Sequence, residues 1–252
     1  MKRRFDQQVI VVTGGSSGIG LAIARAAINE GARRVYITGR SRETLDSALE
    51  MLGERAIALV SDVSRSSDLA RLRAEIEKQG YSLDAVFANA GIAASNTLGA
   101  TSEEQYDELF GINVKGVLLT VQTLLPLMVD GSSLVLTSSI VSGKGMENLS
   151  LYSASKAAVR SFARSWANDL KGRGIRVNAL SPGFTRTPIM KNGLKWNDEQ
   201  IAAFDEQAKT LVPLGHVATP ESIASAALFL ASGDADYVNG VELAVDGGFS
   251  QI

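Results

Sequence analysis

The sequence contains no cysteine and only one histidine among its 252 residues. The lack of cysteine excludes disulfide bonds, a thiol nucleophile and cysteine-based zinc sites, and it is compatible with a cytoplasmic protein. No metal-binding residues are predicted, and the single histidine, His216, is interpreted as structural. The apolar stretch VIVV, residues 9–12, is too short for a signal peptide. No uninterrupted apolar run approaches the about 20 residues of a transmembrane helix, so no membrane association is expected.

An excess of either charge is also absent. The chain carries 25 Lys and Arg against 27 Asp and Glu, and the basic residues are spread evenly. Nucleic-acid binding is therefore not expected, because it needs a basic surface. The composition, 45% hydrophobic and 21% charged, is that of an ordinary globular protein. Since no linker, low-complexity segment or internal repeat divides the chain, we expect one domain over residues 1–252.

The sequence does contain a regular alternation of short β-branched runs and helix-length segments. The early runs are apolar at consecutive positions, as in a parallel sheet that helices cover on both faces. The alternation predicts an α/β fold with a doubly wound sheet. Residues 185–215 break the pattern and are interpreted as a lid-like insertion or a disordered loop. The predicted strands are residues 9–13, 34–38, 56–60, 84–88, 133–138, 175–180 and 241–245.

A glycine-rich segment, TGGSSGIG at residues 13–20, follows the first predicted strand and opens a helix near Ser17. Glycines allow a sharp turn and let backbone N–H groups approach a phosphate, which the helix N-terminus attracts. The spacing differs from that of a P-loop because the required lysine is absent. A tight turn without a ligand is the alternative, but the position directly after the first strand favours dinucleotide binding.

The end of the second predicted strand indicates which dinucleotide is bound. An acidic residue at this point would bind the adenosine ribose 2′-hydroxyl, but the sequence has Gly39, followed by Arg40 and Arg42. Glycine leaves room for a 2′-phosphate, and a guanidinium can hold that phosphate through charge-assisted hydrogen bonds. A solvated arginine in a strand–helix turn is the alternative. NADP(H) is therefore favoured, with NAD(H) as the second choice.

Eight short motifs occur in order along the chain: TGGSSGIG (13–20), DV (62–63), NAG (89–91), Asn113 in GINVKG, Ser139 in LTSSIV, YSASK (152–156), PG with Thr187 (182–187) and VDGG (245–248). Together they resemble the short-chain dehydrogenase/reductase family over essentially the whole chain. The resemblance implies a Rossmann-like, seven-stranded parallel sheet with helices on both faces. It also implies hydride transfer between a nicotinamide cofactor and a carbonyl or alcohol carbon of a small substrate.

The resemblance assigns catalysis to Asn113, Ser139, Tyr152 and Lys156. The i,i+4 spacing of Tyr152 and Lys156 places them on one face of a helix. Ser139 would donate a hydrogen bond to the reacting oxygen, and Tyr152 would exchange its proton with that oxygen. An ammonium about 5 Å away, at an effective dielectric of about 20, stabilises a phenolate by roughly 3 kcal/mol, or about 2 pKa units. We therefore expect Lys156 to lower the pKa of Tyr152, while Asn113 holds a water that links Lys156 to solvent.

The resemblance also implies which residues bind the cofactor. Asp62 would accept a hydrogen bond from the adenine amino group, Val63 would pack on the ring, and Lys156 would bind the nicotinamide ribose. Thr185 stands where the family usually has an aliphatic residue beside the carboxamide, and its backbone contacts are expected to survive this change. The predicted cofactor-binding residues are Gly14, Ser16, Ser17, Gly18, Ile19, Gly20, Arg40, Asp62, Val63, Asn89, Ala90, Gly91, Tyr152, Lys156, Pro182, Gly183, Thr185 and Thr187.

Two other functions stay open. A cofactor-sensing binding protein could keep the fold without turnover, but it would not need the complete set of four catalytic residues. A 3-oxoacyl-carrier-protein reductase would carry basic residues before the fifth strand to dock an acidic carrier. The sequence there is LPLMVDGSS, with Asp130 and no Lys or Arg. A free small carbonyl or alcohol compound is therefore favoured as the substrate.

The helix that carries Tyr152 indicates how the protein assembles. The face opposite Tyr152 holds almost only small residues, which allow a second helix to approach closely. The resemblance implies a second contact through the last helix and the terminal strand, so we expect a homotetramer with two kinds of isologous interface. The residues on the opposite face are Ala154, Ala157, Ser161, Ser165 and Asn168.

Overall fold

The computed structural model describes residues 3–252, and seven parallel strands form its central sheet. The strand order β3-β2-β1-β4-β5-β6-β7 makes β1 and β4 neighbours. The winding direction reverses between them, and open α/β sheets bind their ligands outside the carboxyl ends of the strands at such a point. The predicted fold class is confirmed. The strands are β1 (Val9–Val12), β2 (Arg34–Gly39), β3 (Ala56–Val60), β4 (Leu83–Ala88), β5 (Met128–Thr137), β6 (Arg176–Pro182) and β7 (Glu242–Val245).

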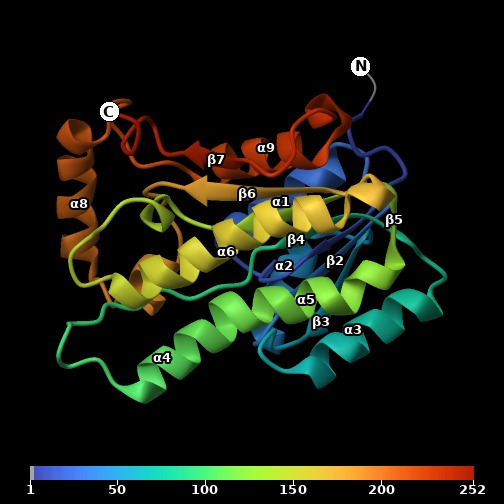
Figure 1. Cartoon of the computed structure of the whole chain (residues 1–252), viewed down its shortest axis with the longest axis horizontal. Helices are drawn as coiled ribbons and strands as arrows, with labels where there is room; N and C mark the ends of the chain where they lie inside the picture. The colour runs from blue at the N-terminus through green and yellow to red at the C-terminus, as the bar shows by residue number, and fades with distance from the viewer. Residues whose placement is uncertain (1–2) are drawn as a thin grey trace.

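Helices cover both faces of this sheet (Figure 1). In β1, Ile10 and Val12 pack into one core, while Val9 and Val11 pack into the other. Burial on both faces explains why the central strands are apolar at consecutive positions. One layer contains α1 (Gly18–Asn29), α2 (Arg42–Leu52) and α9 (Pro220–Ala231), and the other contains α3 (Ser66–Lys78), α4 (Glu103–Phe110), α5 (Gly116–Leu124) and α6 (Ser150–Asp169).

The fifth strand differs from its predicted bounds. It begins at Met128 rather than at residue 133, because Met128 pairs with Leu83 before the register shifts and Ser133 pairs with Ala85. Gly131, between these two pairings, has a φ of 80°, a conformation that glycine adopts without strain. The regularly paired part, residues 133–137, coincides with the predicted strand.

A continuous helical stretch, Glu103–Leu127, joins α4 and α5 through the π-helical segment η1 (Gly111–Lys115) and ends in the 3₁₀ turn η2 (Leu125–Leu127). With a mean hydropathy of 1.3 in its most apolar window, it is long and apolar enough to cross a membrane by length and composition alone. Core helices of soluble proteins meet the same criterion. Here Val117, Val121 and Leu124 of α5 pack into the second core.

The insertion at residues 185–215 is helical, so its interpretation as a disordered loop is wrong. Its longer helix begins with a reciprocal capping box between Asn197 and Gln200, which satisfies backbone groups at the helix start. Phe204 on this helix packs edge-on against Phe184, which follows β6 (centroids 4.7 Å apart). The two helices of the insertion are α7 (Ile189–Asn192) and α8 (Asp198–Leu211).

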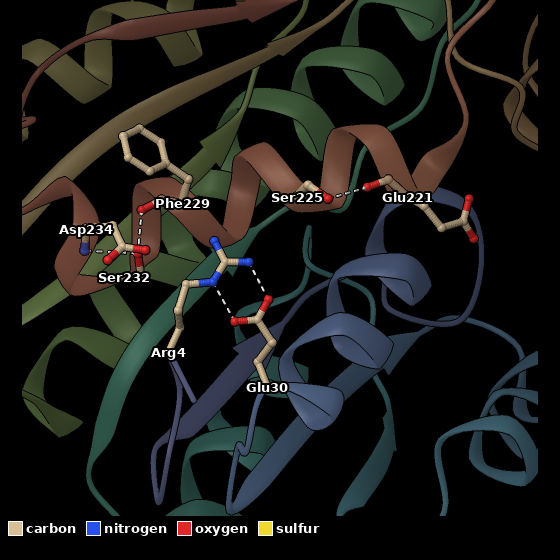
Figure 2. A network of polar contacts seen from close by, with 7 residues as sticks. All are labelled: Arg4, Glu30, Glu221, Ser225, Phe229, Ser232 and Asp234. Atoms are coloured by element: carbon tan, nitrogen blue, oxygen red, sulfur yellow. Dashed lines mark hydrogen bonds and ion pairs between the residues drawn. The ribbon is translucent and has the colours of Figure 1, made fainter. Parts of the chain in front are cut away.

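The N-terminal segment is fastened to the end of α1, close to α9 (Figure 2). The Arg4 guanidinium makes two hydrogen bonds to the Glu30 carboxylate, forming an ion pair. Phe5, next to it, is fully buried in the first core. The remaining short turns are η3 (Ile140–Ser142), η4 (Lys171–Arg173) and η5 (Gly233–Ala235).

Candidate active site

The four predicted catalytic residues lie together at the carboxyl end of the sheet. Ser139 lies two residues after the end of β5, and Tyr152 and Lys156 occupy the first turns of α6. The Ser139 hydroxyl is within hydrogen-bonding reach of Tyr152, and Lys156 Nζ lies 5.7 Å from the Tyr152 ring centroid. A methyl group built on Gly91 would lie 3.3 Å from Lys156 Nζ and 3.2 Å from Asn113 Oδ1. The loop after β4 therefore reaches the same place.

The pKa of Tyr152 is raised above its ordinary value, because burial disfavours the phenolate more than the Ser139 hydrogen bond favours it. The predicted net lowering of the Tyr152 pKa is therefore wrong, because burial outweighs the groups that favour the phenolate. The lysine is itself desolvated, and its ammonium donates a hydrogen bond to the Thr137 carbonyl oxygen (2.9 Å). A raised pKa keeps the phenol protonated at neutral pH, which is the form that can protonate a carbonyl oxygen.

Lys156 is held on β5 as well as on α6. It is only 4% exposed, and burial lowers its pKa from 10.5 to about 8. Its ammonium binds the Thr137 carbonyl oxygen, and its own carbonyl accepts a hydrogen bond from Ser138 Oγ (2.9 Å). Thr137 and Ser138 directly precede Ser139, so these two bonds fix the position of Lys156 relative to the serine.

Asn113 lies fully buried in the π-helical segment η1, a kind of distortion that is frequent at functional sites. Its Oδ1 accepts a hydrogen bond from the Ile92 N–H (2.9 Å), and its Nδ2 donates to the Ile92 carbonyl (2.9 Å) and to Ser155 Oγ (3.1 Å). Ser155 in turn donates to the Tyr152 carbonyl (2.7 Å). Asn113 therefore joins the loop after β4 to α6, and both of its amide hydrogens are already used.

The turn after β1 fits a dinucleotide phosphate. Gly14 and Gly18 have φ values of 66° and 53°, and a methyl group on Gly20 would lie 2.2 Å from the Gly14 carbonyl oxygen. Unlike α2, α4, α8 and α9, helix α1 has no side-chain N-cap and no acidic residue in its first turn. Its first N–H groups are thus left for an anion. Three other predicted cofactor residues lie in the same turn: Ser16, Ser17 and Ile19.

The ends of β2 and β3 fit the adenosine half of such a cofactor. Within residues 3–252, the hydroxyl oxygens of Thr38 and Ser61 are buried without a hydrogen-bond partner. Asp62 follows Ser61, and its Oδ1 accepts two hydrogen bonds from Ser64 (2.9 and 2.7 Å). Its second oxygen remains available as an acceptor. Arg40, at the end of β2, is exposed.

The loop after β4 runs beside the glycine-rich turn. Asn89 Nδ2 donates to the Thr13 carbonyl (3.1 Å), and a methyl group on Gly14 would lie 2.9 Å from Ala90 Cα. Val63 is buried at the same edge. The NAG segment, although far away in the sequence, thus contacts the turn after β1.

The segment after β6 lies at the same edge of the sheet. Pro182 ends β6, and a methyl group on Gly183 would lie 2.6 Å from Asp246 Cβ, so only glycine fits between the strand and the VDGG turn. Thr187 reaches back to the glycine-rich turn, because a methyl group on Gly18 would lie 3.4 Å from Thr187 Cβ.

Thr185 forms an isolated parallel β-bridge with Ala218. The hydrogen bonds of this bridge use the Phe184 carbonyl and the Arg186 N–H (2.9 Å each). The N–H and C=O of Thr185 itself are not used in the bridge. The bridge therefore leaves free the Thr185 backbone groups whose contacts the sequence led us to expect.

Glu242 of β7, a residue without a predicted role, connects three elements of the site. Its carboxylate accepts hydrogen bonds from Ser142 of η3 and Ser181 of β6 (2.6 Å), and it pairs with Arg160 of α6 (2.7 Å). These elements adjoin or carry Ser139, Pro182 and the catalytic helix. No local signal marks Glu242, because all three partners are far from it in the sequence.

The parallel sheet and the group of residues at its carboxyl edge define a dinucleotide-dependent oxidoreductase. A family model described as enoyl-(acyl carrier protein) reductase matches residues 14–250. Oxidoreductase asL5 of Sarocladium schorii is 42% identical over 252 residues, 99% of this chain and 98% of its own. The crystal structure of levodione reductase has a TM-score of 0.90 at 32% identity and matches 98% of this chain and 99% of its own. A 3-ketoacyl-(acyl-carrier-protein) reductase from Brucella melitensis, complexed with NADH, has a TM-score of 0.86 at 29% identity, covering 97% and 99%.

The chain belongs to the short-chain dehydrogenase/reductase family, and it is an oxidoreductase that transfers a hydride between a nicotinamide cofactor and a carbonyl or alcohol group.

Proposed function

We propose that the protein uses NADPH to reduce a small, freely diffusing carbonyl compound, and that the reverse alcohol oxidation runs at the same site. The observation that carries this proposal is the enclosed pair of Ser139 and Tyr152, in which burial raises the phenol pKa. A partly buried phenol that keeps its proton, beside a second hydroxyl, suits the transfer of a proton to a carbonyl oxygen as negative charge develops on it.

The residues divide this work as follows. The bound nicotinamide cofactor supplies or accepts the hydride. Ser139 orients the substrate oxygen by donating a hydrogen bond, and Tyr152 gives its hydroxyl proton to that oxygen. Lys156 provides the nearby positive charge that stabilises the resulting phenolate, and Asn113 fixes the helix that carries both residues through Ser155.

The turn after β2 supports the preference for NADP over NAD. A methyl group on Gly39 would lie 2.9 Å from Ser16 Oγ, so an acidic side chain there would displace Ser16. Arg40 is exposed next to this point and makes no ion pair within residues 3–252, whereas Arg42 faces Asp46 (3.9 Å). Arg40 is therefore the residue we assign to the 2′-phosphate.

One observation favours the alternative substrate, an acyl group on a carrier protein. The start of β5 has no basic residue of its own, but Arg173 of η4 lies there and pairs with Asp130 (2.8 Å). Arg173 also donates hydrogen bonds to the Leu125 and Met128 carbonyls. Because these contacts neutralise and occupy the guanidinium, we keep the free compound as the first proposal. A cofactor sensor without turnover ranks lower, because the catalytic group is complete.

The proposed activity is tested with a panel of small ketones and alcohols, following NADPH and NADH absorbance in parallel. We expect turnover of free carbonyl compounds, with NADPH preferred. Turnover of acyl-carrier thioesters alone would establish the alternative, and binding of cofactor without any turnover would support the sensor.

We also propose that the protein is a cytoplasmic homotetramer whose partners are small molecules rather than nucleic acid or membranes. Ala154, Ser161, Ser165 and Asn168 of α6 are exposed in the single chain, which suits close packing against a second copy. Light scattering at micromolar concentration tests the assembly. A mass near the 26.6 kDa of one chain would contradict it.

A further inference from the structure

Helix α6, which carries Tyr152 in its first turn, begins without a cap of its own. The residue at the N-cap position, Leu149, has an apolar side chain that cannot accept a hydrogen bond from the first N–H groups of the helix. The side-chain oxygen of Asn96, in the loop after β4, accepts a hydrogen bond from the Leu151 N–H instead (3.0 Å). The cap of α6 thus comes from a residue 55 positions before Leu151 in the chain.

The whole amide group of Asn96 is used in this contact. Because a backbone N–H only donates, the amide oxygen must face Leu151, and the amide nitrogen is then directed to two hydroxyl oxygens. It donates to Ser150 Oγ (2.8 Å), at the first position of α6, and to Thr101 Oγ1 (2.9 Å). Asn96 is only 6% exposed, and its backbone N–H donates to the Asn148 carbonyl (2.8 Å). These hydrogen bonds fasten the loop after β4 to the start of α6.

Tyr152 lies between this contact and a second one from the same loop. Asn113, which is itself bonded to the loop after β4, donates to Ser155 Oγ (3.1 Å), and Ser155 donates to the Tyr152 carbonyl (2.7 Å). The Asn96 contact holds Leu151, the residue before the tyrosine. Tyr152 is therefore held from both sides, and loss of the Asn96 contact would leave only the later one. Reaction rates are sensitive to such positions, because a misplacement of about 1 Å can cost about a hundredfold.

We propose that Asn96 is a positioning residue for the reaction: it fixes the first turn of α6 against the loop after β4 and thereby sets where the Tyr152 hydroxyl meets the substrate oxygen. The inference rests on the proposed role of Tyr152 as the proton donor. Asn96 acts through the backbone of α6 and needs no contact with the substrate. Its loss should therefore lower kcat, while the dissociation constant of the cofactor, whose phosphates bind at the turn after β1, should stay near that of the wild type.

The test measures kcat by NADPH absorbance, and fluorescence titration of NADPH gives the dissociation constant and the fraction of folded protein. Asn96→Ala removes the side-chain hydrogen bonds and should lower kcat about tenfold or more. Asn96→Asp keeps an oxygen that can accept from the Leu151 N–H, and the Ser150 hydroxyl can turn to donate to it, so this variant should recover most of kcat. The matched control is Thr97→Val, which removes an exposed hydrogen bond to Asn148 (3.4 Å) between the same two segments and should match the wild type.

Three outcomes would overturn the proposal: an undiminished kcat in Asn96→Ala, a parallel loss of kcat and cofactor affinity in that variant, or a kcat of Asn96→Asp no higher than that of Asn96→Ala. If Asn96→Ala does not fold and binds no cofactor, Thr101→Val takes its place. That substitution removes one of the two acceptors of the Asn96 amide nitrogen. It should lower kcat severalfold at an unchanged dissociation constant, and an unchanged kcat would equally overturn the proposal.

Tyr152→Phe, measured in parallel, separates this inference from the proposed function. An inactive Tyr152→Phe together with a fully active Asn96→Ala would refute only the positioning role of Asn96. An active Tyr152→Phe would refute the proton-donor role of the tyrosine, and with it the inference that rests on that role.

Discussion

The lowered pKa of Lys156 predicts how turnover depends on pH. The lysine must carry its proton to stabilise the phenolate of Tyr152, so kcat/KM for carbonyl reduction should be highest below pH 8 and fall as pH rises through the pKa of about 8. This parameter reports the ionisation of the free enzyme. Above the pKa, each further pH unit lowers the protonated fraction about tenfold.

The same shift affects stability in the opposite direction. The pKa of Lys156 falls from 10.5 to about 8 on folding, which corresponds to roughly 3 kcal/mol. Because the folded pKa lies below the unfolded one, the unfolded chain binds more protons between pH 8 and pH 10.5. The contribution of Lys156 to the free energy of unfolding therefore rises with pH across this window. As the pH rises, kcat/KM should therefore fall while the contribution of Lys156 to the free energy of unfolding increases.

The assay combines NADPH absorbance kinetics from about pH 6 to about pH 10 with urea unfolding at the same pH values. The difference in unfolding free energy between the wild-type protein and Lys156→Met should change by a few kcal/mol between pH 8 and pH 10.5. Lys171→Gln, which alters an exposed lysine, is the control and should follow the wild type in both measurements. A kcat/KM that stays level throughout would refute the reasoning.

Three further predictions concern single residues. Tyr152→Phe should abolish nearly all turnover while the dissociation constant of the cofactor, measured by fluorescence titration, stays close to that of the wild type; substantial activity would contradict the proton-donor role. Arg40→Ala should raise the KM for NADPH about tenfold or more with little effect on the KM for NADH, and an equal change for both would make Arg40 a surface residue only. A methyl group on Gly193 would lie 2.6 Å from the Ala93 carbonyl oxygen although its φ is an ordinary −93°. Gly193→Ala should therefore raise the KM for the carbonyl substrate about tenfold. The control Gly233→Ala, where a methyl group meets nothing within 4 Å, should leave this KM unchanged. Identical kinetics for the two variants would show that α7 need not pack against the loop after β4, which contains Ala93.

The strands and the glycine-rich turn were predictable because their signals are local. The residues of β1 are buried on both faces, which makes four consecutive positions apolar. In the turn after β1, Gly14 and Gly18 adopt positive φ values that disfavour other residues. The start of β5 was not predictable in the same way, because the pairing of Met128 with Leu83 depends on a register shift around Gly131.

The four proposed catalytic residues could be selected from the sequence, but their electrostatics could not. The i,i+4 spacing placed Tyr152 and Lys156 on one helix face, whereas the sign of the tyrosine pKa shift depends on how deeply the finished fold encloses the ring. Likewise, no spacing showed that Asn113 lies in a π-helical segment. The partners of its amide, Ile92 and Ser155, come from two other parts of the chain.

The start of β5 likewise shows that the absence of a basic residue in the local sequence does not exclude one nearby in the fold. The local sequence contains no Lys or Arg, yet Arg173 reaches this point from the turn after α6. A surface charge pattern therefore has to be read from the fold, since residues that are adjacent in space need not be close in sequence.

The position of Glu242 also determines when the site can be completed during synthesis. β7 is the last strand of the chain and forms the edge of the sheet, so Ser142, Arg160 and Ser181 leave the ribosome before their shared acceptor. Until then, burying each of these donors without a partner costs about 1–3 kcal/mol. Nascent chains that stop before β7 should thus remain inactive and prone to unfold, and catalytic competence should appear only once the last strand has been added.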